Sequence, residues 1–253
     1  MLVDTHVHLN SPDFDSDLGR VLERARAAGV QRCLCPGYDL PSSRAAVELA
    51  SRDASILAAV GVHPHDARLY DDATERELQA MLASRAAVAA GEMGLDFHYD
   101  HSPRHIQREV LRRQLRLARR QEVPVILHNR ESDEDMARIL DEEAAGLRGV
   151  LHAFTGARVL LEVGRRLHLF FGIGGFLTFD KHPLAACVCD LPRESLLLET
   201  DAPYLSPHPM RGRRNEPGRV EIIARRLAEI LEISFEEVAA LTTRNCDRFL
   251  EGS

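Results

Sequence analysis

Apolar segments of strand length alternate with amphipathic segments of helical length along the whole chain. Each of eight short apolar runs is followed by a stretch in which apolar residues recur with the helical period of about 3.6. The predicted strands are 2–9, 30–35, 55–62, 86–91, 123–127, 150–151, 168–173 and 196–200. The predicted helices cover 15–28, 74–85, 104–121, 183–187 and 217–231, with others beginning after 42, after 131 and at 157. A further helical segment over 234–241 begins with a capping box of Ser234 and Glu237.

The ends of these strands are evenly spaced, at 23 to 36 residues from one to the next between His8 and Asp201. Eight such units in a chain of about 250 residues are typical of an α/β fold, the (β/α)₈ TIM barrel. An open doubly wound sheet would instead need a Gly-rich phosphate turn after its first strand. The chain has His6-Val7-His8-Leu9-Asn10 there. We therefore predict one TIM-barrel domain over residues 1–253.

Composition and charge narrow the possible functions. Hydrophobic residues make up 45% and charged residues 28%, which is typical of a soluble globular protein. The first residues lack the basic start and apolar run of a signal peptide, and no segment approaches the roughly 18 apolar residues of a membrane span, so we expect a cytoplasmic protein with no membrane association. A net charge of −7 disfavours electrostatic binding of long duplexes. Lys181 is the only lysine, which argues against Schiff-base chemistry and a metal-bridging carboxylated lysine.

Histidines and carboxylates gather at the carboxyl ends of the predicted strands, where TIM barrels place their active sites. Such a set of imidazoles and carboxylates suits two borderline divalent ions such as Zn²⁺ or Mn²⁺. Mg²⁺ is the third candidate ion. The predicted metal ligands are His6, His8, Glu92, His128, His152 and Asp201. With no lysine near the fourth strand, Glu92 is the expected bridging ligand. The two ions would convert a water into hydroxide for attack, and Asp201 would orient it, so Glu92 and Asp201 are the predicted catalytic residues.

Other polar residues near the strand ends are candidates for contacts with a substrate. His63 and His65 lie two residues apart and should face the same side. They are expected to contact a substrate phosphate, to lie in a second shell around the metals, or to stiffen a His-Pro-His turn. Arg130 could hold a phosphate through its guanidinium fork, or form a salt bridge with a nearby carboxylate. Asp4 and Glu199 are expected to face inward and orient the ligand histidines.

Seven motifs, in this order, resemble those of the TatD family of metal-dependent deoxyribonucleases, which lies within the amidohydrolase-like barrels. They are Asp4-Thr5-His6-Val7-His8, Gly61-Val62-His63-Pro64-His65, Glu92-Met93-Gly94-Leu95-Asp96, His128-Asn129-Arg130, His152-Ala153-Phe154-Thr155-Gly156, Glu199-Thr200-Asp201-Ala202-Pro203-Tyr204-Leu205 and Arg214-Asn215-Glu216-Pro217. The resemblance implies a metal hydrolase barrel with the six ligands named above. It also implies DNase activity, commonly as a 3′→5′ exonuclease. Ala153 departs from the family, where Cys or Ser is frequent, but it is not a ligand position.

We therefore expect an enzyme that hydrolyses phosphodiester bonds at single-stranded or frayed DNA ends, with nucleic acid, DNA or RNA, as its partner and no obligate protein partner. DNA repair, RNA processing and turnover are the processes in which it could act. An amidohydrolase-type deacylase, for example of D-aminoacyl-tRNA, would use the same metal site. A third hypothesis, a non-catalytic barrel with structural metals, would require a closed coordination sphere without water.

Overall fold

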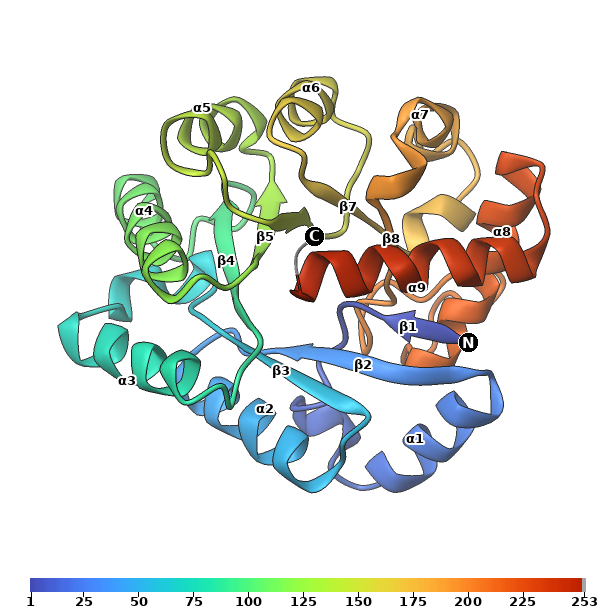
Figure 1. Ribbon diagram of the computed structural model, residues 1–253, viewed down its shortest axis with the longest axis horizontal. Helices are drawn as coiled ribbons and strands as arrows, with labels where there is room; N and C mark the ends of the chain where they lie inside the picture. The colour runs from blue at the N-terminus through green and yellow to red at the C-terminus, as the bar shows by residue number, and fades with distance from the viewer. Residues whose placement is uncertain (252–253) are drawn as a thin grey trace.

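Eight parallel strands follow one another in chain order around a nearly closed barrel (Figure 1). The structure is a computed structural model that describes residues 1–251. The strands are β1 Leu2–Asp4, β2 Val30–Pro36, β3 Ile56–Val60, β4 Ala89–Asp96, β5 Val125–Arg130, β6 Gly149–Leu151, β7 Phe170–Ile173 and β8 Leu196–Leu198. The segments that follow β1 and β8 bring the two ends of the sheet together, because Thr5 N donates to Leu198 O at 2.9 Å and Val7 forms a parallel bridge with Ala202. The predicted TIM barrel is confirmed.

Helices surround this barrel on the outside (Figure 1). They are α1 Leu18–Ala27, α2 Leu40–Arg52, α3 Asp72–Ala83, α4 Arg104–Gln121, α5 Asp133–Glu143, α6 Arg158–Arg166, α7 Leu184–Cys187 and α8 Val220–Leu231. Short 3₁₀ helices lie in the connections, among them η1 Pro12–Phe14, η2 Pro64–Leu69, η3 Gly175–Thr178 and η6 Pro217–Arg219. In the part of the chain that the structure describes, every helix is too short or too polar to cross a membrane.

Two apolar layers hold the barrel together, one between the strands and the outer helices and one inside the barrel. The strands therefore bury both faces, which is why they are visible in the sequence as nearly continuous apolar runs. The interior layer contains one residue from each strand and two from the last helix: Val3, Leu34, Ala59, Ala89, Ile126, Val150, Phe170, Leu197, Cys246 and Phe249.

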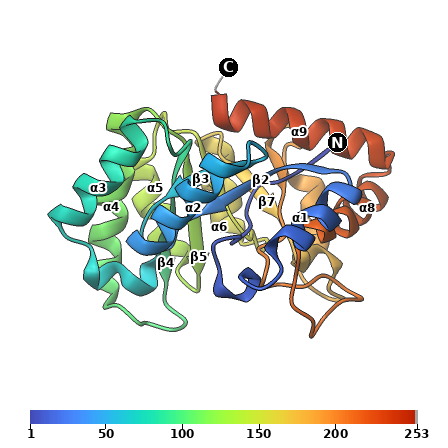
Figure 2. The same cartoon turned by 90° about the horizontal axis from the view of Figure 1, so that it is seen from below.

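The last helix, α9 Phe235–Glu251, lies across one end of the barrel (Figures 1 and 2). Its Phe249 ring packs 5.6 Å from the ring of Phe170, the first residue of β7, so α9 covers the end at which the strands begin. The predicted segment 234–241 is therefore too short, because packing against the barrel extends the helix to Glu251. Its capping box is confirmed: Ser234 N donates to Glu237 Oε2 at 2.8 Å, and Glu237 N donates to Ser234 Oγ at 3.2 Å.

The arginine-rich helix α4 is part of the outer ring. Arg113 pairs with Asp72 and Glu75 of α3, and Arg116 pairs with Glu143 of α5. These side chains link neighbouring helices, which confirms the interpretation of 104–121 as an ordinary barrel helix and not as a nucleic-acid surface.

The first strand is shorter than predicted and the fourth is displaced. The segment 2–9 forms β1 only as far as Asp4, and β4 covers 89–96 in place of the predicted 86–91. After Asp4 the chain bonds alternately to its two neighbours, because Val7 N donates to Leu34 O at 3.0 Å and His8 N donates to Ala202 O at 2.8 Å. The result is an irregular segment that carries His6 and His8 at the open end of the barrel, opposite α9.

Removing the Phe249 side chain should destabilise the protein by about 3–5 kcal/mol, because Phe249→Ala leaves a cavity in a fully buried cluster. Urea unfolding followed by circular dichroism measures this change. Arg244→Ala, an exposed position on the same helix, is the matched control and should change stability by less than about 0.5 kcal/mol. Equal stability of the two variants would show that α9 does not support the barrel interior.

Candidate metal centre

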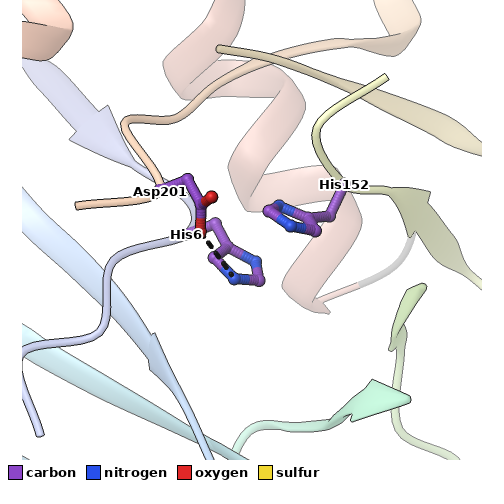
Figure 3. A group of neighbouring side chains, drawn as sticks. All are labelled: His6, His152 and Asp201. Carbon is purple, nitrogen blue, oxygen red and sulfur yellow. Dashed lines mark ion pairs between the residues drawn. The ribbon is translucent and has the colours of Figure 1, made fainter. Parts of the chain in front are cut away.

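Four imidazoles and two carboxylates converge at the open end of the barrel. His6 Nε2 lies 3.2 Å from His8 Nε2, 3.3 Å from Glu92 Oε2 and 3.7 Å from Asp201 Oδ1. His8 Nε2 lies 3.6 Å from Glu92 Oε2 and 3.5 Å from Asp201 Oδ1. Figure 3 shows His6 and Asp201 beside His152, whose ring stacks on that of His6 at 3.5 Å between centroids.

The other oxygen of Glu92 faces a second group of imidazoles. Glu92 Oε1 lies 2.8 Å from His128 Nδ1, 3.5 Å from His152 Nε2 and 3.8 Å from His63 Nε2. The structure therefore brings all six predicted ligands together and places Glu92 at the centre. His63 joins this group, which matches the alternative that placed it beside the metal ligands.

The buried carboxylates favour positive charge at this place. Burial opposes protonation of His152, but the carboxylates of Glu199, Glu92 and Asp201 outweigh burial and raise its pKa to about 10. Burial raises the pKa of Glu92, yet His6, His152 and His128 lower it more, so the group stays well below its usual value. A cation is needed to balance these ionised groups, whether it is a proton on His152 or a metal ion.

The donor atoms fit divalent metal ions. Three groups of three ligand atoms lie within 4.8 Å of one another: His6, His152 and Asp201; His6, His8 and Glu92; His63, Glu92 and His128. The Nε2 atoms of His6 and His8 face each other at 3.2 Å, and their outer Nδ1 atoms are buried with no hydrogen-bond partner. Imidazole nitrogens and carboxylate oxygens in this arrangement are the ligands that Zn²⁺ and Mn²⁺ accept.

Glu199 holds His152 as predicted. Its Oε1 lies 3.0 Å from His152 Nδ1 and accepts a hydrogen bond from Ala153 N at 2.6 Å, which leaves His152 Nε2 facing the cluster. Space for this carboxylate comes from Gly172 on β7, where a Cβ would lie 2.1 Å from Glu199 Oε2. A residue with a side chain at this position would therefore displace the carboxylate that holds His152.

Asp4 does not orient a ligand ring, and that prediction is wrong. Its carboxylate accepts hydrogen bonds from Thr200 N at 2.9 Å and His6 N at 3.3 Å, and lies 2.5 Å from Thr200 Oγ1. The strict alternation assumed for 4–8 ends where β1 ends. Asp4 instead ties the backbone of β1 to the segment after β8, and its burial raises its pKa to about 8.

Asp96 is a site residue that the sequence analysis did not single out. Its Oδ2 lies 3.0 Å from His65 Nε2 and 3.3 Å from His128 Nε2. Burial raises the pKa of Asp96, but these two contacts lower it below its ordinary value. The spacing held the signal, because Asp96 lies four residues after Glu92 on β4 and shares its face. Gly94 between them allows the close approach of β5: its φ is +156°, and a Cβ would lie 1.9 Å from His128 O.

The contacts of His63 and His65 match the alternative in which the pair stiffens a His-Pro-His turn. His65 N donates to His63 Nδ1 at 3.2 Å, which stiffens the turn at the start of η2. A neutral His63 that accepts at Nδ1 carries its proton on Nε2, the atom that faces Glu92. Burial lowers the pKa of His63 well below its usual value, so the ring is neutral and presents an N–H donor to the cluster.

Arg130 is exposed at the end of β5, and its guanidinium lies 4.7 Å from the centre of the Tyr99 ring. Within residues 1–251 it forms no ion pair, so the alternative of a salt bridge is not observed. Arg214 differs, because it donates to both carboxylate oxygens of Asp17 at 2.8 Å and lowers the pKa of Asp17 to about 2. Arg214 therefore anchors the loop after β8 to the segment before α1.

The closed barrel and its cluster of histidines and carboxylates define the class of metal-dependent TIM-barrel hydrolases. A family model described as TatD related DNase matches residues 3–251. The chain belongs to the TatD family of metal-dependent hydrolases.

Relatives cover nearly the whole chain. An uncharacterized metal-dependent hydrolase, YabD of Bacillus subtilis, is 43% identical over 98% of both chains. A protein of Edwardsiella piscicida called 3′-5′ ssDNA/RNA exonuclease TatD is 38% identical over 90% of both chains. The solved structure of YJJV, a TatD homolog from Escherichia coli, has a TM-score of 0.92 and 31% identity, and covers 98% of this chain and 97% of its own.

Replacing Glu199 with Gln should weaken divalent-metal binding about 10- to 100-fold, because His152 loses the carboxylate that fixes its ring. Competition with a chromogenic chelator measures the affinity without relying on activity. Glu131→Gln is the control, since that exposed carboxylate contacts His98 at 2.6 Å and none of the ligands. Unchanged affinity in Glu199→Gln would show that the contact with His152 does not support metal binding.

Proposed function

We propose that this chain is a 3′→5′ exonuclease that removes nucleotides from single-stranded or frayed DNA or RNA ends with two divalent ions. The observation that carries the proposal is the position of Glu92, whose two carboxylate oxygens face different groups of imidazoles. Two neighbouring metal positions that share one carboxylate suit phosphodiester hydrolysis. The names of relatives such as the Edwardsiella piscicida protein support the same substrate class.

Each ion would have its own ligands, with Glu92 shared. His6, His8, Glu92 and Asp201 would hold the first ion, and Glu92, His128 and His152 the second, as either Zn²⁺, Mn²⁺ or Mg²⁺. When bound, such ions supply an activated water and stabilise the negative charge that develops on the phosphate.

The protein's own groups position the substrate and move a proton. Burial raises the pKa of Asp201, but hydrogen bonding to His8 and the charges of His152 and His6 lower it below its ordinary value. Asp201 is therefore ionised and accepts the proton of the attacking water. His63 donates its Nε2 hydrogen to a phosphoryl oxygen, and Arg130 pairs with a phosphate through its free guanidinium. His65, which is fixed by Asp96, contacts the substrate beside it.

The net negative charge of the protein is consistent with action at the ends of nucleic-acid strands. Two divalent ions carry more positive charge than Glu92 and Asp201 carry negative charge, so the loaded site attracts a few phosphates. The protein as a whole has a net charge of −7 and does not attract a long duplex. An unpaired end that reaches the cluster is therefore the favoured substrate.

Stepwise shortening of single-stranded oligonucleotides labelled at the 3′ or the 5′ end tests the proposed function. Wild-type protein with Mn²⁺, Mg²⁺ or Zn²⁺ should release nucleotides from the 3′ end, and chelator should abolish the activity. Glu92→Ala should lose more than about 100-fold in rate because both ions lose a ligand, while Glu131→Ala should retain it. Elemental analysis should find two ions in wild type.

Two other results of this assay would contradict the proposed function. Metal-loaded protein that leaves DNA and RNA intact but hydrolyses aminoacyl esters in a parallel assay would replace the nuclease by a deacylase. Equal activity in wild type and Glu92→Ala would identify a contaminating nuclease.

Replacing Arg130 with Ala should lower kcat/KM for single-stranded DNA about 10- to 100-fold, since a charge-assisted hydrogen bond contributes about 1.5–3 kcal/mol. The loss should shrink as ionic strength rises, because screening weakens the wild-type contact. Arg244→Ala, at the opposite end of the barrel, is the control of equal charge. If both variants behave alike at every salt concentration, Arg130 does not contact phosphate.

A further inference from the structure

Two exposed tyrosines stand at the open end of the barrel, on the loops that follow β8 and β4. The exposed fractions are 57% for Tyr204 and 51% for Tyr99. The only other exposed large hydrophobic residues in the part of the chain that the structure describes are Met1 and Leu69. Because an exposed aromatic ring gains nothing from burial, its position beside the metal cluster calls for another explanation.

Tyr204 lies directly against a metal ligand. Its ring centre is 6.0 Å from that of His8, with the two planes at 68°. Tyr38 contacts the same imidazole at 5.7 Å and 67°. His8 is thus flanked by two aromatic rings, of which Tyr204 is open to solvent.

The backbone of Tyr204 is fixed although its ring is exposed. Tyr204 N donates to Asp201 O at 2.8 Å, and Asn215 Nδ2 donates to Tyr204 O at 2.7 Å. Asn215 is fully buried and also donates to Thr200 O at 2.9 Å. The backbone that carries the ring is therefore fixed before any ligand arrives, which lowers the entropic cost of binding.

The second tyrosine is on the opposite side of the cluster. Tyr99 N donates to Asp96 Oδ1 at 3.0 Å, and the Arg130 guanidinium lies over the Tyr99 ring. In the strand order of the barrel, β8 is opposite β4, and β1 is opposite β5. The metal cluster therefore lies between an aromatic ring at Tyr204 and a cation at Arg130.

We infer that Tyr204 is a stacking site for an unpaired nucleobase next to the phosphate that is cleaved, with the strand crossing the open end of the barrel toward Arg130. The inference rests on the proposed nuclease function and adds a base-binding position to it. Aromatic stacking accepts any base, because each base has a π face. A base within a duplex has both faces covered by its neighbours, so this contact selects single-stranded ends.

Steady-state hydrolysis of two matched single strands tests this inference. One strand is natural DNA, and the other carries tetrahydrofuran abasic residues in place of its last nucleotides. Tyr204→Leu should lower kcat/KM on natural DNA about tenfold. The change should be small on the abasic strand, which keeps the phosphates and lacks the bases. Tyr204→Phe keeps the ring and should restore most of the wild-type value on natural DNA.

The outcomes separate the two proposals. Wild-type activity on single strands with an equal loss on natural and abasic strands, or with no loss in Tyr204→Leu, would overturn the stacking site and leave the nuclease standing. Absence of any activity of the metal-loaded wild type on either strand would overturn both. A metal content of Tyr204→Leu equal to that of wild type rules out indirect damage to His8.

Discussion

The ionised carboxylate of Glu92, buried at the meeting point of five histidines, is the constraint on which this site depends. A buried charge is costly unless charges and hydrogen bonds compensate it, and Glu92 is only 3% exposed. Compensation comes from imidazoles on β5 and on the segments after β1 and β6, so the carboxylate is satisfied only when the barrel is assembled. The outer contacts follow from this need: Glu199 fixes His152, and Asp96 fixes His128. Gly94 and Gly172 leave the space in which these contacts form.

One end of the barrel stabilises the fold, and the other end carries the candidate metal centre. At the end where the strands begin, α9 buries Phe249 in the apolar interior of the barrel. This packing stabilises the fold through apolar contacts. At the other end, the last residues of the strands and the segments that follow them carry histidine and carboxylate side chains. Side chains at one end can therefore vary the chemistry while apolar layers hold the fold, which is the general logic of TIM barrels.

Several arginines of the outer surface are neutralised by neighbouring carboxylates, whereas, within residues 1–251, an arginine near the metal cluster is not. Arginines on α4 are bound to carboxylates of α3 and α5, and Arg214 is bound to Asp17, so the excess of arginine does not make a basic surface. Arg130 is placed differently, since it lies over Tyr99 near the cluster without an acidic partner among the described residues. Among these arginines, the one without an acidic partner in the described part of the chain thus lies at the open end of the barrel.

The sequence by itself determined the alternation of strands and helices, the eightfold repeat, the TIM barrel and the six residues that meet at its open end. These follow from local periodicity and from the rule that strand ends share one edge, so no knowledge of distances is needed. Only the tertiary structure decided that β1 stops at Asp4, that Asp4 bonds to Thr200, that Asp96 joins His65 to His128, and that Tyr204 lies against His8. It also decided the length of α9. Each of these depends on contacts between segments far apart in the chain, and hydrophobic periodicity carries no information about such contacts.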